Sequence, residues 1–168
     1  MQKAFFLTMF NMGIMFILMW GLDLKINISK SFPLGVYQRV DAEIEKDTIV
    51  ESCLPESVSS FMVDRGYIPD GGSCGGYPPV IKQVYGLAGD VVEVDQSVSI
   101  NGVLIDNTIV NQYDERRNIL TAAKSTVIEE NNVWLMSAQS PKSFDARYFG
   151  QIPLSHVQSA LKPLWTVR

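Results

Sequence analysis

The chain begins with an apolar run in which residues Ala4 to Leu22 form nineteen consecutive uncharged positions. As a helix at about 1.5 Å per residue, this run spans about 28 Å, close to the thickness of the hydrocarbon core of a bilayer. A cleaved signal peptide normally has a shorter apolar region and a small-x-small site, which the sequence MWGLDLKINIS lacks. The pattern therefore favours a retained membrane anchor at residues 1–24 over a cleaved signal.

Beyond the anchor, short runs of alternating apolar and polar residues are separated by turn-forming residues. The clearest run spans residues 78–105, where Asn101-Gly102 is a strong signal for a tight hairpin. The apolar spacing of residues 58–65 fits a short helix. The tail, residues 153–165, fits either a helical turn that ends before Pro163 or a final strand. Further strands are expected at residues 34–40, 46–52 and 131–138.

Many short strands with turn signals predict a mostly β fold of antiparallel strands. No linker-like stretch divides the rest of the chain, so residues 25–168 are expected to form one domain. Lys3 and the free amine precede the apolar run, and no further charge follows until Asp23. The positive-inside tendency then places the N-terminus in the cytoplasm and everything after Leu22 outside it.

Composition narrows the possible functions. The 168 residues include 14 basic and 18 acidic side chains, for a net charge of -4, and no basic block stands out. Nucleic acid is therefore not an expected partner, because binding phosphates requires clustered Lys and Arg. One histidine and two cysteines that are separated by twenty residues match no zinc spacing, so no metal is expected.

The two cysteines, Cys53 and Cys74, gain significance if the domain lies outside the cytoplasm. In an oxidising compartment they most economically form one disulfide. Closing a loop of about 22 residues contributes roughly 3 kcal/mol in the chain-entropy model. The alternative, a redox-active dithiol, usually has the spacing C-x-x-C.

Two kinds of side chain could activate a serine nucleophile. The lone histidine, His156, would have to serve any Ser-His-Asp arrangement, but its surroundings, IPLSHVQS, do not resemble a triad segment. A lysine can replace histidine if it is neutral, which means lowering its pKa from about 10.4 to near 7 at a cost of about 4.6 kcal/mol. Burial among apolar side chains, without a close carboxylate partner, has that effect.

Lys82 fits this requirement best, because it lies in the apolar run PPVIKQVYGLAG with no acid between Asp70 and Asp90. The alternative is a strand lysine that faces water while Ile81 and Gln83 take the other face. The alternation of the strand does not decide between the two.

The candidate nucleophile lies in NISKSFPLGVY, residues 27–37. Ser31 is nine residues beyond Leu22, so an extended chain keeps its hydroxyl within about 30 Å of the end of the anchor. Pro33 and Gly35 provide a rigid bend and a permissive position. The hydroxyl of Ser29 could assist an oxyanion beside the backbone N–H of Ser31. Taken alone, the segment fits a capping or turn serine better than a nucleophile.

Three segments resemble the TraF-type signal peptidases of conjugative transfer systems, which belong to the serine-lysine signal peptidase I superfamily. NISKSFPLGVY resembles the box N-x-[ST]-x-S-x-P-x-G-x-Y. The segment from residue 53 to 94 includes PVIKQVYGLAGD, which is similar to P-x-x-K-x-V-x-G-x-x-G-D. SFDARYFGQI resembles S-x-D-S-R-Y-[FW]-G-x-[IV]. The boxes occur in the family's order and run from about residue 27 to 153.

The resemblance implies a role for each matching residue. Ser31 would be the nucleophile and Lys82 the general base. Ser29 would assist the oxyanion, and Asp145 would be the third functional residue of the TraF-type members. The implied fold is the β-domain of signal peptidase I behind one transmembrane helix, with the site facing the membrane.

Two more positions and several departures complete the comparison. Ser143 would help to orient the lysine, and Arg147 would hold a structural salt bridge. Gln83 replaces the arginine that is common after the lysine, and Ala146 replaces serine in the last box. General signal peptidases have S-M-x-P where this chain has the shorter Ser31-Phe-Pro, and they carry a G-D-N that is absent here. These departures point away from housekeeping secretion and towards a dedicated partner.

The resemblance therefore implies a membrane-anchored serine endopeptidase of the bacterial inner membrane, with its catalytic domain in the periplasm. Its partners would be the membrane and a membrane-presented precursor, in particular a conjugative pilin, with other conjugative transfer proteins as further partners. The acyl-enzyme would be resolved by water or by an amine, and the second route cyclises the substrate. No metal or organic cofactor is expected. The alternative is a non-catalytic periplasmic assembly module of a conjugation or secretion apparatus.

Overall fold

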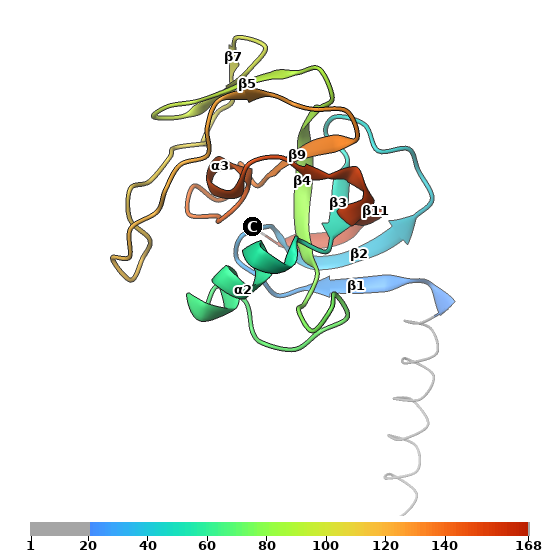
Figure 1. The fold of residues 1–168 in the computed structure, drawn as a ribbon. Helices are drawn as coiled ribbons and strands as arrows, with labels where there is room; N and C mark the ends of the chain where they lie inside the picture. Colours follow the sequence, from blue (N-terminus) through green and yellow to red (C-terminus); the bar gives the residue numbers. More distant parts are fainter. Residues whose placement is uncertain (1–20, 168) are drawn as a thin grey trace, which may run out of the picture.

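The computed structural model of the chain describes residues 21–167. In that range the chain is built mainly of short strands, with two short α-helices and one 3-10 helix (Figure 1). The elements are β1 (Leu24–Asn27), β2 (Leu34–Val40), β3 (Ile49–Ser52), α2 (Glu56–Asp64), β4 (Val80–Leu87), β5 (Val91–Val94), β6 (Val98–Ile100), β7 (Val103–Leu104), β8 (Thr126–Val127), β9 (Asn132–Met136), α3 (Ala146–Phe149), β10 (Ile152–Pro153), the 3-10 helix η1 (Leu154–His156) and β11 (Val157–Val167).

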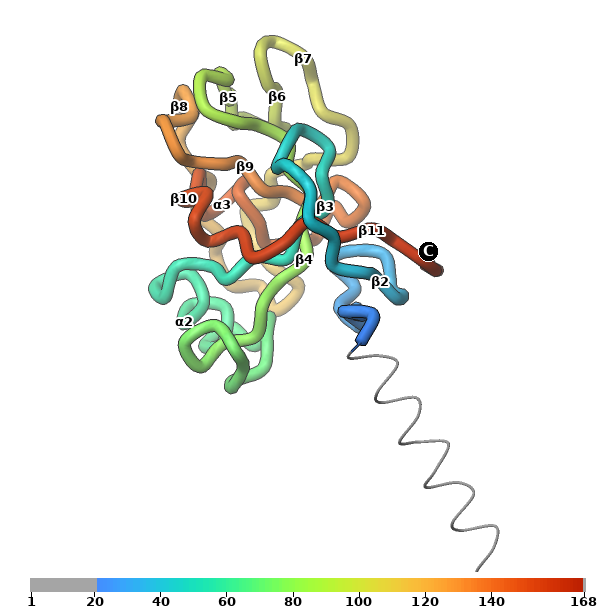
Figure 2. Tube along the Cα trace, turned by 90° about the vertical axis from the view of Figure 1, so that its right-hand side faces the viewer, coloured from blue at the N-terminus to red at the C-terminus, as the bar shows by residue number. Residues whose placement is uncertain are grey.

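The strands form two sheets in which every pairing is antiparallel. The larger sheet has the order β1-β2-β11-β3-β4-β9-β10, and the smaller sheet has the order β7-β6-β5-β8. Figures 1 and 2 show the smaller sheet at one end of the molecule and α2 at the other. The predicted mostly β, antiparallel fold is confirmed for the described residues.

Most local predictions agree with the structure. The run at residues 34–40 coincides with β2, and the longer run at 78–105 contains β4 to β7. Asn101 and Gly102 both have positive φ, 52° and 76°, as a tight two-residue hairpin turn requires. The expected helix at 58–65 overlaps α2, which begins after Pro55 and is followed by a glycine with φ of 66°.

The tail contains both of the structures that its pattern allowed. The 3-10 helix η1 comes first, and β11 then runs through Pro163, where its pairing with β2 becomes irregular. A proline lacks the N–H that a sheet ladder needs, which accounts for that irregularity. β11 pairs with both β2 and β3, so this last strand lies inside the larger sheet and not at its edge.

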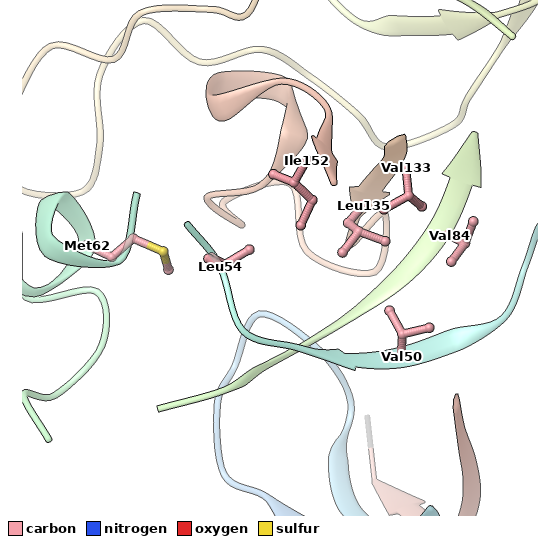
Figure 3. Packing of buried hydrophobic residues seen from close by; sticks show 7 residues of the cluster. All are labelled: Val50, Leu54, Met62, Val84, Val133, Leu135 and Ile152. Atoms are coloured by element: carbon pink, nitrogen blue, oxygen red, sulfur yellow. The ribbon is translucent and has the colours of Figure 1, made fainter. Parts of the chain in front are cut away.

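The core lies on both sides of β9. Val133 and Leu135 face one cluster, whereas Trp134 and Met136 face another, and all four side chains are fully buried. Strands buried on both faces carry continuous apolar runs, as this one does. Figure 3 shows the first cluster, which joins α2 to β3, β4 and β9; its members are Val50, Leu54, Met62, Val84, Val133, Leu135 and Ile152.

A disulfide joins Cys53, directly after β3, to Cys74 in the loop before β4, with a Cα–Cα distance of 5.3 Å. The predicted pairing is confirmed. The bridge closes the segment that contains α2 and ties it to the larger sheet.

The anchor predicted at residues 1–24 lies outside the described residues, except for its last four. Among residues 21–167, the helices are too short or too polar to cross a bilayer. The division into an anchor and a single domain at 25–168 stays a prediction.

Candidate active site

The turn between β1 and β2 carries the candidate nucleophile, and the side chain of Asn27 holds it in shape. The Asn27 Nδ2 group donates to the carbonyl oxygens of Ser29 at 3.1 Å, Phe32 at 2.9 Å and Pro33 at 3.0 Å. Its Oδ1 accepts the backbone N–H of Ser29 at 3.0 Å. The amide nitrogen has two N–H groups for three carbonyls, so one of them is shared; together with Oδ1, this buried side chain contacts four backbone groups of the turn.

The end of the turn is fastened to the larger sheet. Phe32 is buried against Tyr37 and Leu161, and the Tyr37 hydroxyl donates to the carbonyl of Pro33 at 2.7 Å. At Gly35, φ is 153°, and the backbone carbonyl of Trp165 in β11 occupies the place of a Cβ. Only glycine allows the strands to approach this closely, so the chain leaves the turn along a defined path.

Within the turn, the two serine hydroxyls lie together at the surface. Ser29 Oγ and Ser31 Oγ are 3.0 Å apart, and the backbone N–H of Ser31 points to Ser29 Oγ at 3.4 Å. The two groups expected to hold an oxyanion, this N–H and the Ser29 hydroxyl, are thus neighbours on the exposed side of the turn.

Lys82 lies in β4 on the face that points inward. It shares that face with Val84 and Gly86, and its exposure is 2%. The burial of Lys82 therefore excludes the alternative of a strand lysine facing water. Its Nζ donates to Ser143 Oγ at 2.7 Å, and this hydroxyl is itself buried.

Burial lowers the pKa of the Lys82 amine from 10.5 to about 8. Desolvation of the ammonium is the largest cause; the charge of Asp145 opposes it and that of Arg147 reinforces it. With a pKa of about 8, about a tenth of the amines are neutral at pH 7. The amine can therefore act as a base near neutral pH without a large further cost.

Asp145 and Arg147 form an ion pair that is completely buried. Arg147 Nε donates to Asp145 Oδ1 and Arg147 Nη2 donates to Oδ2, each at 2.8 Å, and both side chains are 0% exposed. Asp145 also caps α3 by accepting the backbone N–H of Arg147, and it accepts the backbone N–H of Ser137 at the end of β9. The pair thus joins α3 to β9.

The guanidinium of Arg147 also holds the loop that leads to Ser143. It donates to four backbone carbonyls, those of Ile109, Ser140, Pro141 and Ser143. Because the carbonyl of Ser143 is fixed in this way, its hydroxyl keeps a constant position next to Lys82. Arg147 occupies the salt-bridge role that the sequence resemblance implied for it.

The structure brings some of the expected site residues together and leaves others apart. Ser31 pairs with Ser29, and Lys82 pairs with Ser143, but no hydrogen bond joins Ser31 to Lys82. The two halves are linked by packing, because Phe32, next to Ser31, lies in a cluster that also contacts Ile81. Asp145 makes no hydrogen bond to Ser31 or to Lys82.

Sequence reasoning assigned no role to Asn27, although it is the first residue of the NISKSFPLGVY segment. An asparagine two residues before a turn serine is a recognisable turn signal, and here it marks the residue that shapes the turn. His156, the rejected base, contacts the backbone carbonyl of Cys53 through Nδ1 at 2.6 Å. Residues 21–167 contain no group of three His, Cys, Asp or Glu side chains that could hold a metal ion.

Comparisons with known proteins identify the family of the chain. Residues 4–165 match the family described as signal peptidase, peptidase S26. The plasmid transfer protein TraF of Escherichia coli is 34% identical over 146 residues, covering 84% of this chain and 82% of the relative. The conjugal transfer protein TraF of Agrobacterium tumefaciens (strain 15955) is 30% identical over 145 residues, with the same coverage.

Among solved structures, a signal peptidase I of Enterococcus faecalis V583 aligns with 73% of this chain and 100% of its own, at 20% identity and a TM-score of 0.45. The match to the family extends over nearly the whole chain and includes the turn of Ser31, the strand of Lys82 and the segment from Ser143 to Arg147. The chain therefore belongs to the signal peptidase family, peptidase S26, in its TraF-type branch.

Proposed function

We propose that the chain is a membrane-anchored serine peptidase that uses Ser31 as nucleophile and Lys82 as general base. The observation that carries the proposal is the buried, apolar position of Lys82, whose amine has a pKa of about 8 and a single hydrogen bond, to Ser143. A lysine kept partly neutral in this way can accept the proton of a serine hydroxyl. The family of the chain supports a peptidase role.

In the proposed mechanism, neutral Lys82 takes the proton from Ser31 Oγ as that oxygen attacks a peptide carbonyl. The resulting oxyanion is held by the backbone N–H of Ser31 and the Ser29 hydroxyl. Lys82 then gives its proton to the leaving amine, and an acyl-enzyme ester on Ser31 remains. Water resolves the ester by hydrolysis; an amine of the substrate resolves it by forming a new peptide bond, which would give a cyclic product.

Proton transfer requires the two halves of the site to come within about 2.6–3.2 Å of each other. In this structure Lys82 Nζ donates a hydrogen bond to Ser143 Oγ, and Ser31 Oγ is hydrogen-bonded to Ser29 Oγ. Catalytic hydrogen bonds are often longer in a free enzyme and tighten when substrate binds. Asp145 is best understood as a positioning residue, because it acts through Arg147 and the loop that carries Ser143.

The proposed substrate is a membrane-presented precursor, specifically a pilin precursor of a conjugation apparatus. The relatives with 34% and 30% identity are named as plasmid transfer and conjugal transfer proteins, which supports this choice. The proposed location is the bacterial inner membrane, with residues 25–168 in the periplasm. Exposed apolar side chains, among them Ile26 in β1, Ile28 directly after β1 and Trp165 in β11, suit a surface beside the bilayer.

The test is the processing of the precursor, followed by mass spectrometry, in the variants Ser31→Ala and Lys82→Ala. Both should lose processing by a factor on the order of 10³ or more. Ser155→Ala in η1 and Lys162→Ala in β11 change exposed residues of the same types outside the proposed site and should process normally. Continued processing by both site variants would instead favour the non-catalytic assembly module.

A further inference from the structure

A second candidate site lies on the far side of the Ser143–Asp145 segment, between α2, α3 and residues 119–121. It is a groove of about 280 Å³, lined on one wall by Ser57, Phe61 and Arg65 of the α2 region and on the other by Phe144 and Tyr148. None of these groups is used by the proposed mechanism. The disulfide between Cys53 and Cys74 closes the segment that supplies the first wall.

The aromatic side chains form a continuous apolar surface in this groove. Phe144 stacks on Tyr148 with ring centroids 5.3 Å apart and an interplanar angle of 4°. It also stacks on Phe61, again at 5.3 Å, with an angle of 25°. Because the rings support one another, the groove is preformed and would lose little side-chain entropy when it is filled.

The guanidinium of Arg65 lies at this apolar surface and forms an ion pair with Asp114. Its Cζ is 4.7 Å from the centroid of the Phe61 ring. Its buried Nη1 atom has no hydrogen-bond partner among residues 21–167. The nearest acidic oxygen, Asp114 Oδ2, is 3.8 Å away, which is too far for a hydrogen bond.

Asp114 has little capacity left for Arg65. Its carboxylate accepts hydrogen bonds from the Tyr67 hydroxyl, from the side-chain amide and backbone N–H of Asn118, and from the backbone N–H of Arg116. These four bonds occupy the acceptor positions of a carboxylate. Arg65 is therefore a cation beside an apolar surface whose ion pair with Asp114 is long, which leaves other donors of its guanidinium for a second anion.

We propose that this groove binds the carboxyl-terminal residue of an apolar polypeptide. The terminal carboxylate would accept charge-assisted hydrogen bonds from Arg65, and the terminal side chain would pack against Phe61 and Phe144. The size of the groove favours a chain end, since about 280 Å³ corresponds to roughly nine water molecules and is smaller than most ligand pockets. A positively charged chain end would be repelled by Arg65.

The position of the groove gives such a ligand access to the proposed active site. Phe144 lies between Ser143, which contacts the amine of Lys82, and Asp145, which pairs with Arg147. A peptide end packed on Phe144 would thus contact the segment that orients the lysine. The groove itself does not depend on the proposed peptidase activity, and its binding is measured without any cleavage.

The experiment is fluorescence polarisation with the full chain in lipid nanodiscs. The probe is a fluorescein-labelled peptide, Gly-Ser-Gly-Ser-Leu-Phe, with a free carboxyl terminus, and empty nanodiscs measure its partition into lipid. Two further peptides distinguish a terminal carboxylate from a side-chain carboxylate. One is the same sequence with a terminal amide, and the other is that amide with glutamate before the last residue. The free acid should bind at least about 10-fold more tightly than either amide, because a charge-assisted contact is lost.

Protein variants complete the test. Arg65→Gln should weaken binding of the free acid by about 10-fold or more, and Ser57→Trp should abolish it by filling the groove. Arg117→Gln alters an exposed arginine in the neighbouring loop and should leave binding unchanged. Circular dichroism verifies that each variant is folded. The proposal would be overturned if the free acid and the terminal amide bound equally, or if folded Arg65→Gln bound the free acid as tightly as the wild type does. If the amide with glutamate bound as tightly as the free acid, the assignment to a chain terminus would be overturned.

Discussion

The two halves of the proposed active site are held in opposite ways. The turn that carries Ser31 lies at the surface and is shaped by neutral hydrogen bonds from one side chain, Asn27. The amine of Lys82 is buried, and the loop that contacts it is held by the fully buried ion pair of Asp145 and Arg147. The nucleophile is accessible, whereas the base is kept away from water.

This difference follows from what each group must do. A nucleophile has to reach a substrate that arrives from outside, so its turn can be exposed and can adjust. A lysine has to lose its charge, and only desolvation lowers its pKa sufficiently. The charges next to the lysine must also be paired and held in place, because an unpaired charge in a region of low dielectric would shift the pKa of the lysine again. Four predictions test this comparison.

The largest effect on stability is expected for Asp145→Ala. The substitution leaves Arg147 buried without its partner, and the loss of one partner from a buried pair costs about 3–5 kcal/mol of unfolding free energy. Urea unfolding of the chain in nanodiscs measures the change. Glu115→Ala removes an exposed partner of Lys142 and serves as the control, for which no measurable loss is expected. A loss no larger than in this control would contradict the structural role of the pair.

Lys82 should make stability depend on pH. Its pKa is about 8 in the folded chain, against 10.5 for an unburied lysine. Between these values the unfolded chain binds the proton more strongly, so the free energy of unfolding rises with pH, by about 3 kcal/mol in total. Below pH 8 the cost of burying the charge is present in full.

The variant Lys82→Met isolates this effect, since it lacks the amine and retains a side chain of similar length. The difference in unfolding free energy between the two proteins, measured from pH 7 to 10.5, should shrink as pH rises. The pKa of Tyr67, which burial and Asp114 raise to about 12, affects both proteins equally and cancels. A difference that stays constant over this range would mean that the amine is not desolvated. Precursor processing by the wild-type chain should increase through about pH 8.

Ser143→Ala removes the 2.7 Å partner of the Lys82 amine but leaves its apolar surroundings. A hydrogen bond to a charged group contributes about 1.5–3 kcal/mol, so the rate of processing should fall by about 10- to 100-fold. Ser143→Thr keeps the hydroxyl and should recover part of the rate. Single-turnover processing measures both variants, and an unchanged rate for Ser143→Ala would mean that this contact does not orient the base.

The smallest effect is expected for Asn27→Ala. The backbone groups that it leaves are neutral, and three of the four hydrogen bonds are only partly buried, so the cost should be about 1 kcal/mol of unfolding free energy. Asn27→Asp keeps the acceptor for the Ser29 N–H but loses the three donated bonds, and it should process more slowly than the wild type. If Asn27→Ala destabilised the chain as strongly as Asp145→Ala, the contrast between the two halves would be wrong.

Much of the fold could be predicted because it depends on local pattern. The strand at residues 34–40 and the hairpin at Asn101-Gly102 result from alternation and turn chemistry, which act over a few residues. The three segments that resemble the family motifs identified Ser31, Lys82 and Ser143 as candidates, because each motif has specific residue types at fixed positions. The disulfide followed from there being only two cysteines.

The sequence alone therefore determined the strands, their turns, the cysteine pair and the candidate groups. It could not determine which face of β4 is buried. Lys82 and Ile81 both have apolar neighbours, and alternation defines the two faces of a strand without showing which of them is buried. Only the tertiary structure decided that, by placing the Ser143 loop over the face of β4 that carries the lysine. It likewise placed β11 between β2 and β3 and enclosed Arg147 among four carbonyls, because burial and hydrogen bonding depend on contacts between segments that are distant along the chain.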